Sequence, residues 1–272
     1  MMRIDHDFHL HTRLSSCSGD PRQTAERLLQ YALENGLKKL CVTDHFWDET
    51  VPGASNWYAS QNFEHIRQIL PLPESEQVKL FFGCETELDK HFRLGIAPQT
   101  MEKLDFIIIP TTHLHMSGFT IDTERDGSRE ARARLWAERL DAVLSMPLPF
   151  HKIGIAHLTC PLMAKDPQGE YLRVLDLIPD GVMRDLFSRA AACGVGIELN
   201  FDPIMPSRDE LPRVLRPYRI AKEEGCKFYF GTDAHHPSSL HTVRANRIVQ
   251  LLALEEEDAF TLPEVSVTDF GT

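Results

Sequence analysis

The sequence DFHLHT at residues 7–12, followed by a helical pattern at residues 21–35, decides the fold class. The apolar character of residues 7–11 indicates a short strand that ends on two histidines. The second segment is typical of a helix, because Asp20 can cap it, the proline at its start suits the first turn and Gly36 suits its end. A strand and a helix joined in this order form one unit of a parallel α/β fold.

Six further strand candidates alternate with helical segments along the chain. The strand candidates are residues 39–43, 80–85, 106–111, 153–157, 196–200 and 228–233, and the clearest later helices are residues 128–145, 180–193, 207–224 and 239–254. No repeat, low-complexity tract or linker marks a second domain, so the sequence predicts a single domain over residues 1–272. Seven strand–helix units are compatible with two architectures, a closed parallel barrel and an open doubly wound sheet.

The composition is that of an ordinary soluble globular protein. The 272 residues include 29 Lys and Arg against 40 Asp and Glu, which gives a formal net charge of −11. This acidic balance argues against a broad nucleic-acid surface, which needs clustered basic residues. No run of eighteen apolar residues and no N-terminal signal pattern occurs, so we expect a cytoplasmic protein without membrane contact. The six cysteines form no CxxC pair, which argues against a disulfide framework or a zinc knuckle.

Histidine and carboxylate residues gather at the carboxyl ends of the predicted strands. In chain order they are His9, His11, His45, Glu85, His113, His157, Asp233 and His235. In a closed parallel barrel all strand ends meet on one face, and that face is where the active sites of such barrels lie. The distribution therefore favours the barrel over the open sheet.

The spacing and number of these residues predict a metal centre. His9 and His11 are two residues apart on a strand, so their side chains point the same way and can bind one cation together. Asp233 and His235 repeat this spacing. The whole set exceeds the three protein ligands that one catalytic zinc needs, so we expect two or three divalent ions. Mixed imidazole and carboxylate ligands suit zinc, iron or manganese alike.

Two histidines compete for one position after the fourth strand. His113 is nearer the strand end and is the preferred ligand, which leaves His115 as a substrate-binding residue or a neighbour of the ligands. The histidines outside the pattern are interpreted as surface residues or as supports of the ligands; they are His6, His65, His91, His151 and His241.

In this order the motifs resemble one family. They are His9-x-His11-Thr12, Thr43-Asp44-His45, Gly83-x-Glu85, a strand ending near His113, Gly154-Ile155-Ala156-His157 and Gly231-Thr232-Asp233-Ala234-His235. The combination is similar to that of the PHP family, the polymerase and histidinol phosphatase superfamily, from about residue 7 to about residue 241. The resemblance implies an α/β fold with a distorted (β/α)7 TIM-like barrel and a trinuclear metal cluster that hydrolyses phosphate esters.

The resemblance also implies a division of the ligands between the ions. His9, His11, Glu85, His113 and Asp233 would hold one pair of ions, with Glu85 bridging, and His45, His157 and His235 would hold the third ion together with the loop after the first strand. A hydroxide activated by the metals would attack the phosphate, which makes Asp233, His235 and Glu85 the expected catalytic residues. His115 or a metal-bound water would protonate the leaving group.

The loop after the first strand departs from the family pattern. Where histidinol phosphatases have a histidine, this chain has Cys17, and the next hard ligand is Asp20. We favour Asp20 as the ligand, because an oxygen donor matches the rest of the set. The alternative is that Asp20 only caps the following helix and Cys17 is a buried thiol. This departure leaves the third ion and histidinol phosphate as the substrate open.

Several residues near the strand ends are candidates for substrate binding. Among the basic residues Arg13, Lys152, Arg208 and Arg244, we favour Arg208 as the phosphate ligand. Asn200 shares one face of the sixth strand with Glu198, and either could orient the substrate or a metal ligand. Trp47, Trp57 and Tyr58 follow His45, where they either line the substrate site or pack a long loop.

These observations predict a metal-dependent phosphoesterase acting on a phosphate monoester of a small molecule, similar to histidinol phosphatases. A phosphodiesterase or exonuclease is the alternative within the same chemistry, although the acidic charge makes a nucleic-acid partner less suitable. An amidohydrolase-like enzyme would need a bridging lysine at the fourth strand end, and residues 111–113 contain none. A barrel that keeps its metals without catalysis is the non-enzymatic alternative. The oligomeric state is not readable from the sequence.

Overall fold

The predicted strand segments form one parallel sheet. The computed structural model describes residues 1–125, 127–165, 170–201 and 207–263. The strands are β1 (His6–Leu10), β2 (Lys39–Val42), β3 (His45–Phe46), β4 (Lys79–Thr86), β5 (Phe106–Pro110), β6 (Ile153–Ala156), β7 (Gly196–Leu199) and β8 (Lys227–Phe230). Their order in space is β1-β2-β4-β5-β6-β7-β8, with β3 paired to β4 beside this path, and every pairing is parallel.

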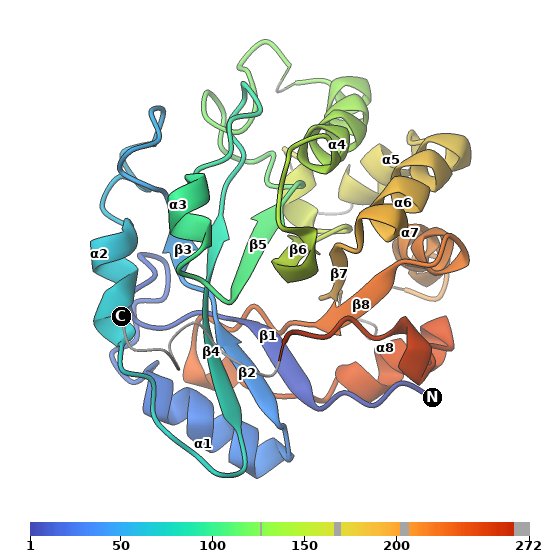
Figure 1. Cartoon of the computed structure of the whole chain (residues 1–272). Coiled ribbons are helices and arrows are strands. Elements are labelled where there is room, and N and C mark those ends of the chain that lie inside the picture. Colours follow the sequence, from blue (N-terminus) through green and yellow to red (C-terminus); the bar gives the residue numbers. More distant parts are fainter. Residues whose placement is uncertain (126, 166–169, 202–206, 264–272) are drawn as a thin grey trace.

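The first and last strands meet where each one ends. Leu10 and Ala234 form an isolated parallel bridge. The backbone N–H of Asp233 donates to the carbonyl of His9 at 2.9 Å, and that of His11 donates to the carbonyl of Ala234 at 3.2 Å. The sheet is therefore a nearly closed seven-strand barrel with β3 as a short extra strand, and the strands curve into it in Figure 1. This confirms the predicted TIM-like barrel and excludes the open sheet.

Helices surround this barrel on its outer side (Figure 1). They are α1 (Ala25–Asn35), α2 (Phe63–Ile66), α3 (Pro98–Met101), α4 (Arg129–Leu144), α5 (Glu170–Asp176), α6 (Asp180–Cys193), α7 (Leu211–Glu223) and α8 (Ala245–Leu252). Helices α4 and α6 match the predicted segments to within one residue, whereas α7 and α8 begin four and six residues later than predicted. In the ranges that the structure describes, none of these helices combines the length and the apolar character needed to span a membrane.

Helix α1 begins at Ala25 rather than at residue 21, so the predicted start is wrong. The Asp20 side chain accepts a hydrogen bond from the Arg22 backbone N–H at 2.9 Å, which forms a local turn before the helix. Thr24 is the residue that caps the helix, because its hydroxyl accepts from the Arg27 N–H at 3.3 Å. Gly36 ends the helix as predicted, in the left-handed conformation at φ 68°.

An aromatic cluster fills the barrel interior toward the amino ends of the strands. Phe8, Phe106 and Tyr229 are fully buried in it, and the rings of Phe106 and Tyr229 meet edge to face with centroids 5.1 Å apart. Gly154 leaves room for these rings, since a Cβ there would lie 2.5 Å from both of them. The packed interior confines polar side chains to the opposite end, where the carboxyl ends of the strands lie.

Candidate metal centre

Eight of the nine predicted ligands lie together at the carboxyl ends of the strands. They form three overlapping groups whose donor atoms lie within 4.8 Å of one another, and a fourth such group joins His9 and His157 with Glu198. The central group is His9, His11, Glu85 and Asp233; the imidazole group is His11, His45 and His235; the lateral group is Glu85, His113 and His157. Residues that are more than two hundred positions apart in sequence thus share one site, as the barrel prediction required.

In the central group, His9 of β1 and His11, directly after β1, face two carboxylates. His11 Nε2 lies 3.1 Å from Asp233 Oδ1 and 3.4 Å from Glu85 Oε2. His9 Nε2 lies at similar distances from the same two oxygens, 3.4 and 3.5 Å. Two imidazoles and two carboxylates around one space are a donor set that suits zinc, iron and manganese.

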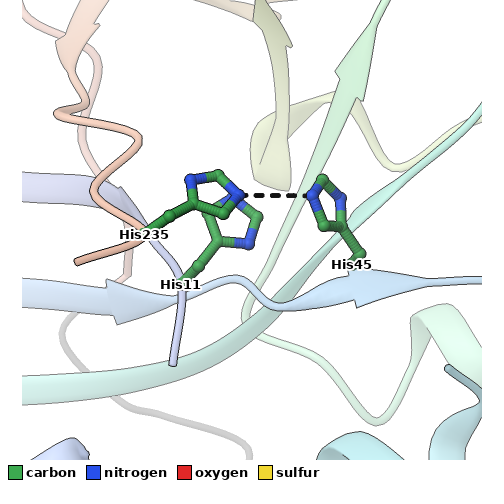
Figure 2. Close-up of side chains that lie close together, drawn as sticks. All are labelled: His11, His45 and His235. Atoms are coloured by element: carbon green, nitrogen blue, oxygen red, sulfur yellow. Dashed lines mark hydrogen bonds between the residues drawn. The ribbon is translucent and has the colours of Figure 1, made fainter. Parts of the chain in front are cut away.

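The imidazole group joins the first strand to β3 and to the loop after β8. Figure 2 shows His235 and His45 facing each other, with their Nε2 atoms 3.4 Å apart. The rings of His11 and His235 stack with centroids 3.9 Å apart. The short strand β3 explains the position of His45, because its pairing with β4 sets His45 directly opposite Glu85. His45 Nδ1 consequently lies 2.9 Å from Glu85 Oε2.

The lateral group lies on the other side of Glu85. His157 Nε2 is 3.4 Å from Glu85 Oε1, and the rings of His113 and His157 stack with centroids 5.1 Å apart. The two oxygens of Glu85 thus face different histidines, Oε2 toward the central group and Oε1 toward His157. This geometry agrees with a bridging role for Glu85 between two ions.

Several donor atoms in this cluster lack hydrogen bonds although they are buried. Within the described ranges, both carboxylate oxygens of Glu85, Oδ1 of Asp233 and Nδ1 of His45 have no hydrogen-bond partner. Leaving a buried polar atom unsatisfied costs about 1–3 kcal/mol, and more for a charged group. Divalent cations coordinated by these atoms would satisfy all of them, so the residues present fit a metal centre.

Glu198 on β7 supports two of the histidines from behind. Its fully buried carboxylate accepts from His9 Nδ1 at 2.5 Å and from the backbone N–H of His157 at 3.1 Å. Such a contact fixes the proton on Nδ1 and leaves Nε2 free to bind a metal. Asn200 Nδ2 lies 3.3 Å from His157 Nδ1, so this residue contacts a histidine of the cluster in addition to its predicted role toward substrate.

Asp44 and Ser15 support His11, directly after β1, and neither was predicted from the sequence to do so. His11 Nδ1 lies 2.9 Å from Ser15 Oγ, and this hydroxyl donates to Asp44 Oδ1 at 2.6 Å. Asp44 also accepts from the backbone N–H and the hydroxyl of Thr12, each at 2.7 Å. The sequence offered a clue to Asp44, because this residue immediately precedes the predicted ligand His45 in the motif Thr43-Asp44-His45.

Glu87 and Arg139 form a third support that sequence reasoning missed. Glu87 Oε2 accepts from His113 Nδ1 at 2.9 Å, and its Oε1 accepts from Arg139 Nη2 at 3.0 Å. Both charged side chains are fully buried. Glu87 lies two residues after Glu85, a spacing that could have suggested it, whereas nothing local distinguishes Arg139 from the other arginines of α4.

The electrostatics of the cluster keep its carboxylates ionised. Burial opposes the charged form of Asp233, but the positive charge of His9 and the adjacent imidazole of His11 lower its pKa well below the usual range. Burial likewise opposes charge on His11, yet the neighbouring carboxylates of Asp233 and Glu85 raise its pKa to about 9. Burial and the charge of His11 lower the pKa of His235 to about 3. The carboxylates are thus in the form that binds cations.

Two residues of the cluster have a backbone conformation that is unusual for their type. His157 and Asp233 lie in the left-handed region, at φ 60° and φ 55°. A side chain other than glycine or asparagine is strained there, at a cost of about 1–3 kcal/mol. Contacts hold both residues in this conformation. The His157 carbonyl accepts from the Thr112 hydroxyl at 2.6 Å, and the Asp233 N–H donates to His9.

Asp20 is the predicted ligand that the structure does not bring into the cluster. Its carboxylate contacts Arg22 Nη2 at 2.6 Å and His236 Nε2 at 2.8 Å. Cys17, the alternative ligand, is exposed, and among the described residues neither belongs to a donor group. His236 was not considered in the sequence analysis.

The predicted substrate residues His115 and Arg208 lie outside the donor groups. His115 is exposed next to His113, with ring centroids 5.4 Å apart. Desolvation and the charge of His113 lower the pKa of His115 to about 4. Arg208 is exposed in the turn that precedes α7. Trp57 packs edge-on against His45 with ring centroids 5.0 Å apart.

We expect Asp20→Asn to keep the metal content of the wild-type protein, because Asp20 pairs with Arg22 and His236 instead of pointing to the cluster. Elemental analysis of protein purified without chelators measures this directly. Asp233→Asn is the matched control, since the same isosteric change there removes a donor of the central group. If Asp20→Asn lost one equivalent of metal, Asp20 would be a metal ligand, as the sequence predicted.

The comparisons with known proteins agree with this geometry. The family model of the PHP domain matches residues 7–200. The chain belongs to the PHP family. Among solved structures, this PHP protein is similar to histidinol phosphate phosphatase from Lactococcus lactis subsp. lactis Il1403 in complex with zinc, L-histidinol and phosphate, with a TM-score of 0.63 and 18% identity over 96% of this chain and 99% of that one.

A second similar structure is the putative histidinol phosphatase of Listeria monocytogenes, with a TM-score of 0.59 and 12% identity over 89% of this chain and 99% of that one. No curated protein matches the sequence. At these identities the two structures establish the PHP barrel fold.

Proposed function

We propose that this PHP protein is a metal-dependent phosphoesterase that hydrolyses a phosphate monoester of a small molecule. The observation that carries the proposal is Glu85, whose two buried oxygens lack hydrogen bonds and face separate groups of histidines. A carboxylate between two cation sites is the arrangement of enzymes that activate water and bind phosphoryl oxygens with paired ions. The fold is shared with a phosphatase whose structure contains zinc and phosphate, which supports the same chemistry here.

Divalent ions held by the three donor groups would lower the pKa of a water and neutralise charge on the phosphoryl oxygens. The residues of the chain hold these ions and set their spacing. Glu85 and Asp233 supply negative charge to the central group, and His235 supplies a neutral imidazole, in keeping with its low pKa. Glu198 and Asp44 keep His9 and His11 in one orientation, so little rearrangement is needed when substrate binds.

A cavity next to Asp233 supports a small molecule as the substrate. It has a volume of about 280 Å³, and its polar lining residues include Asn200, Thr232, Ser239, His241 and Arg244. A cavity of this size fits a leaving group of a few atoms while the phosphate lies at the metals. Arg244 lines this cavity, so it now replaces Arg208 as the proposed basic residue for substrate binding.

We expect Arg244→Met to raise KM about tenfold or more with a smaller change in kcat, because a charge-assisted hydrogen bond to substrate contributes about 1.5–3 kcal/mol. Steady-state kinetics with the best substrate measure the split between KM and kcat. Arg247→Met is the matched control, because Arg247 is exposed on the same helix α8. A larger effect of Arg208→Met than of Arg244→Met would contradict this assignment and support the sequence prediction.

The proposed function is tested with protein purified without chelators. The metal content per chain is measured first, and a panel of phosphate monoesters that includes histidinol phosphate is then compared with bis-p-nitrophenyl phosphate and with amide substrates. We expect bound divalent metal and turnover of monoesters. Faster turnover of the diester would favour the phosphodiesterase alternative, amide hydrolysis would favour an amidohydrolase-like enzyme, and the absence of bound metal would refute the proposal.

A further inference from the structure

Helix α4 presents a row of buried hydrogen-bond donors to the loops that carry two histidines of the metal centre. Arg132, Trp136 and Arg139 are spaced four and three residues apart, so they lie on one face of the helix. Their side chains are at most 2% exposed. We call these three residues the α4 donor row.

Each member of the α4 donor row donates to a backbone carbonyl close to His113 or His157. Arg139 Nε donates to Thr111 at 2.8 Å, and Arg132 Nη1 donates to Leu114 at 2.8 Å, so the two arginines hold the chain on both sides of His113. Trp136 Nε1 donates to the carbonyl of Leu158 at 3.1 Å, directly after His157. The two backbone segments that carry His113 and His157 are thus attached to a single helix.

Additional bonds of the arginines link these loops to their surroundings. Arg132 Nη1 also donates to the carbonyl of Met163 at 3.0 Å, in the loop after β6. Arg139 Nη1 donates to the carbonyl of Thr120 at 3.1 Å, in the loop after β5. A guanidinium group has five donors in a rigid plane, which lets one buried side chain fix several carbonyls at once.

Arg139 also acts on the imidazole of His113 through Glu87. Its Nη2 pairs with Glu87 Oε1 at 3.0 Å, and Glu87 Oε2 accepts from His113 Nδ1 at 2.9 Å. The charge of Arg139 offsets the cost of burying the Glu87 carboxylate, which would be strongly unfavourable on its own. Because Glu87 accepts a hydrogen bond from His113 Nδ1, Nε2 of His113 is the nitrogen left to bind a metal.

A contribution to the stability of the fold does not by itself explain why Arg139 and Glu87 form a buried ion pair. Replacement of such pairs by apolar residues is often neutral or stabilising, because the desolvation of two charges offsets their attraction. Here the pair contacts His113 of the lateral group at one end and, at the other, the carbonyls of Pro110 at the end of β5 and of Thr111 and Thr120 in the loop that follows. That connectivity indicates a positioning role rather than a role in stability alone.

We propose that the α4 donor row and Glu87 form a positioning frame for the lateral group, which sets the affinity of Glu85, His113 and His157 for their ion. This inference rests on the proposed binding of metals. The central group contacts no member of the frame, since His9 is oriented by Glu198 and His11 by Ser15, although Glu198 also accepts from the backbone N–H of His157. A change in the frame therefore weakens one ion and leaves the ion of the central group bound.

The test is a titration of bound metal against a competing chelator, with Glu87→Gln as the first variant. We expect the affinity for one equivalent to fall about 10- to 100-fold, the range observed when a support of a metal ligand is removed. The remaining equivalents should change less than twofold. Substituted Co²⁺ gives a second readout, because its absorption spectrum should lose the component of the weakened site. Arg134→Met is the control, since Arg134 is exposed on the same helix.

Two milder variants keep the inference testable if Glu87→Gln does not fold. Trp136→Phe removes only the N–H bonded to Leu158 and keeps an aromatic ring in the core, and we expect it to weaken the same equivalent several-fold. Arg139→Lys keeps the charge but loses the planar fork, so it should weaken that equivalent as well. Thermal melts in the presence of chelator show whether each variant is folded.

The outcomes separate this inference from the proposed function. Wild-type protein that binds no metal refutes both. If the wild-type protein binds metal but all equivalents weaken in parallel in the variants, the frame only stabilises the barrel and the inference is wrong. Unchanged affinity in folded Glu87→Gln or Trp136→Phe also overturns it, while the phosphoesterase proposal stands.

Discussion

Replacing Glu85 with glutamine is expected to lower kcat/KM by at least about 10³-fold, since paired ions supply several kcal/mol of transition-state stabilisation. Glu85 belongs to both the central and the lateral group, so the amide weakens two ion sites at once. The amide also cannot supply the negative charge that a cation needs between two sets of neutral imidazoles. Steady-state kinetics and metal analysis on the same preparation measure both effects.

Glu102→Gln is the matched control for this change, because Glu102 is exposed at the end of α3. Its activity and metal content should equal those of the wild-type protein. Circular dichroism separates a lost site from a lost fold. A folded Glu85→Gln protein that keeps more than a tenth of the wild-type activity would show that Glu85 does not bridge ions.

Removal of the metal ions is expected to abolish activity and to lower the melting temperature on the order of 10 °C. An ion present at a thousandfold its Kd stabilises the folded state by about 4 kcal/mol. Each kcal/mol changes the melting temperature of a domain of this size by about 2–4 °C. Calorimetry before and after dialysis against a chelator gives the shift, and addition of zinc, manganese or ferrous iron should restore both properties.

Asp233→Asn serves as the comparison for metal removal. Since it lacks a donor of the central group, its melting temperature should respond less to the chelator than that of the wild-type protein. Activity of the chelated wild-type protein at the original level would contradict a metal-dependent mechanism.

The strand pattern could be predicted from the sequence, because buried parallel strands are short, apolar and β-branched and carry their polar residues at one end. Strand β3 could not be predicted, since a segment of two residues is too short to show a periodic pattern of apolar residues. Its pairing with β4 is a tertiary contact. The start of α1 was misjudged for a different reason. Asp20 and Thr24 are both good capping residues, and only the turn at Arg22 decides between them.

The ligand candidates at the strand ends could also be predicted, because the barrel brings those ends together whatever the loops do. Their roles as ligands stay predictions. The supports behind them were harder to find, because a buried charge looks like a surface charge in the sequence. Arg139 shows this most clearly. It lies in a helix with three other arginines, and only the packed structure distinguishes it.

The left-handed backbone at His157 and Asp233 makes these two positions markers of selection. A chain that kept the barrel but abandoned its chemistry would gain stability from glycine at either position, because glycine adopts this conformation without strain. Mutational drift should therefore replace them early once function is no longer maintained. In related sequences, histidine and aspartate at these positions would indicate an enzyme still under selection, and glycine would indicate one that has lost it.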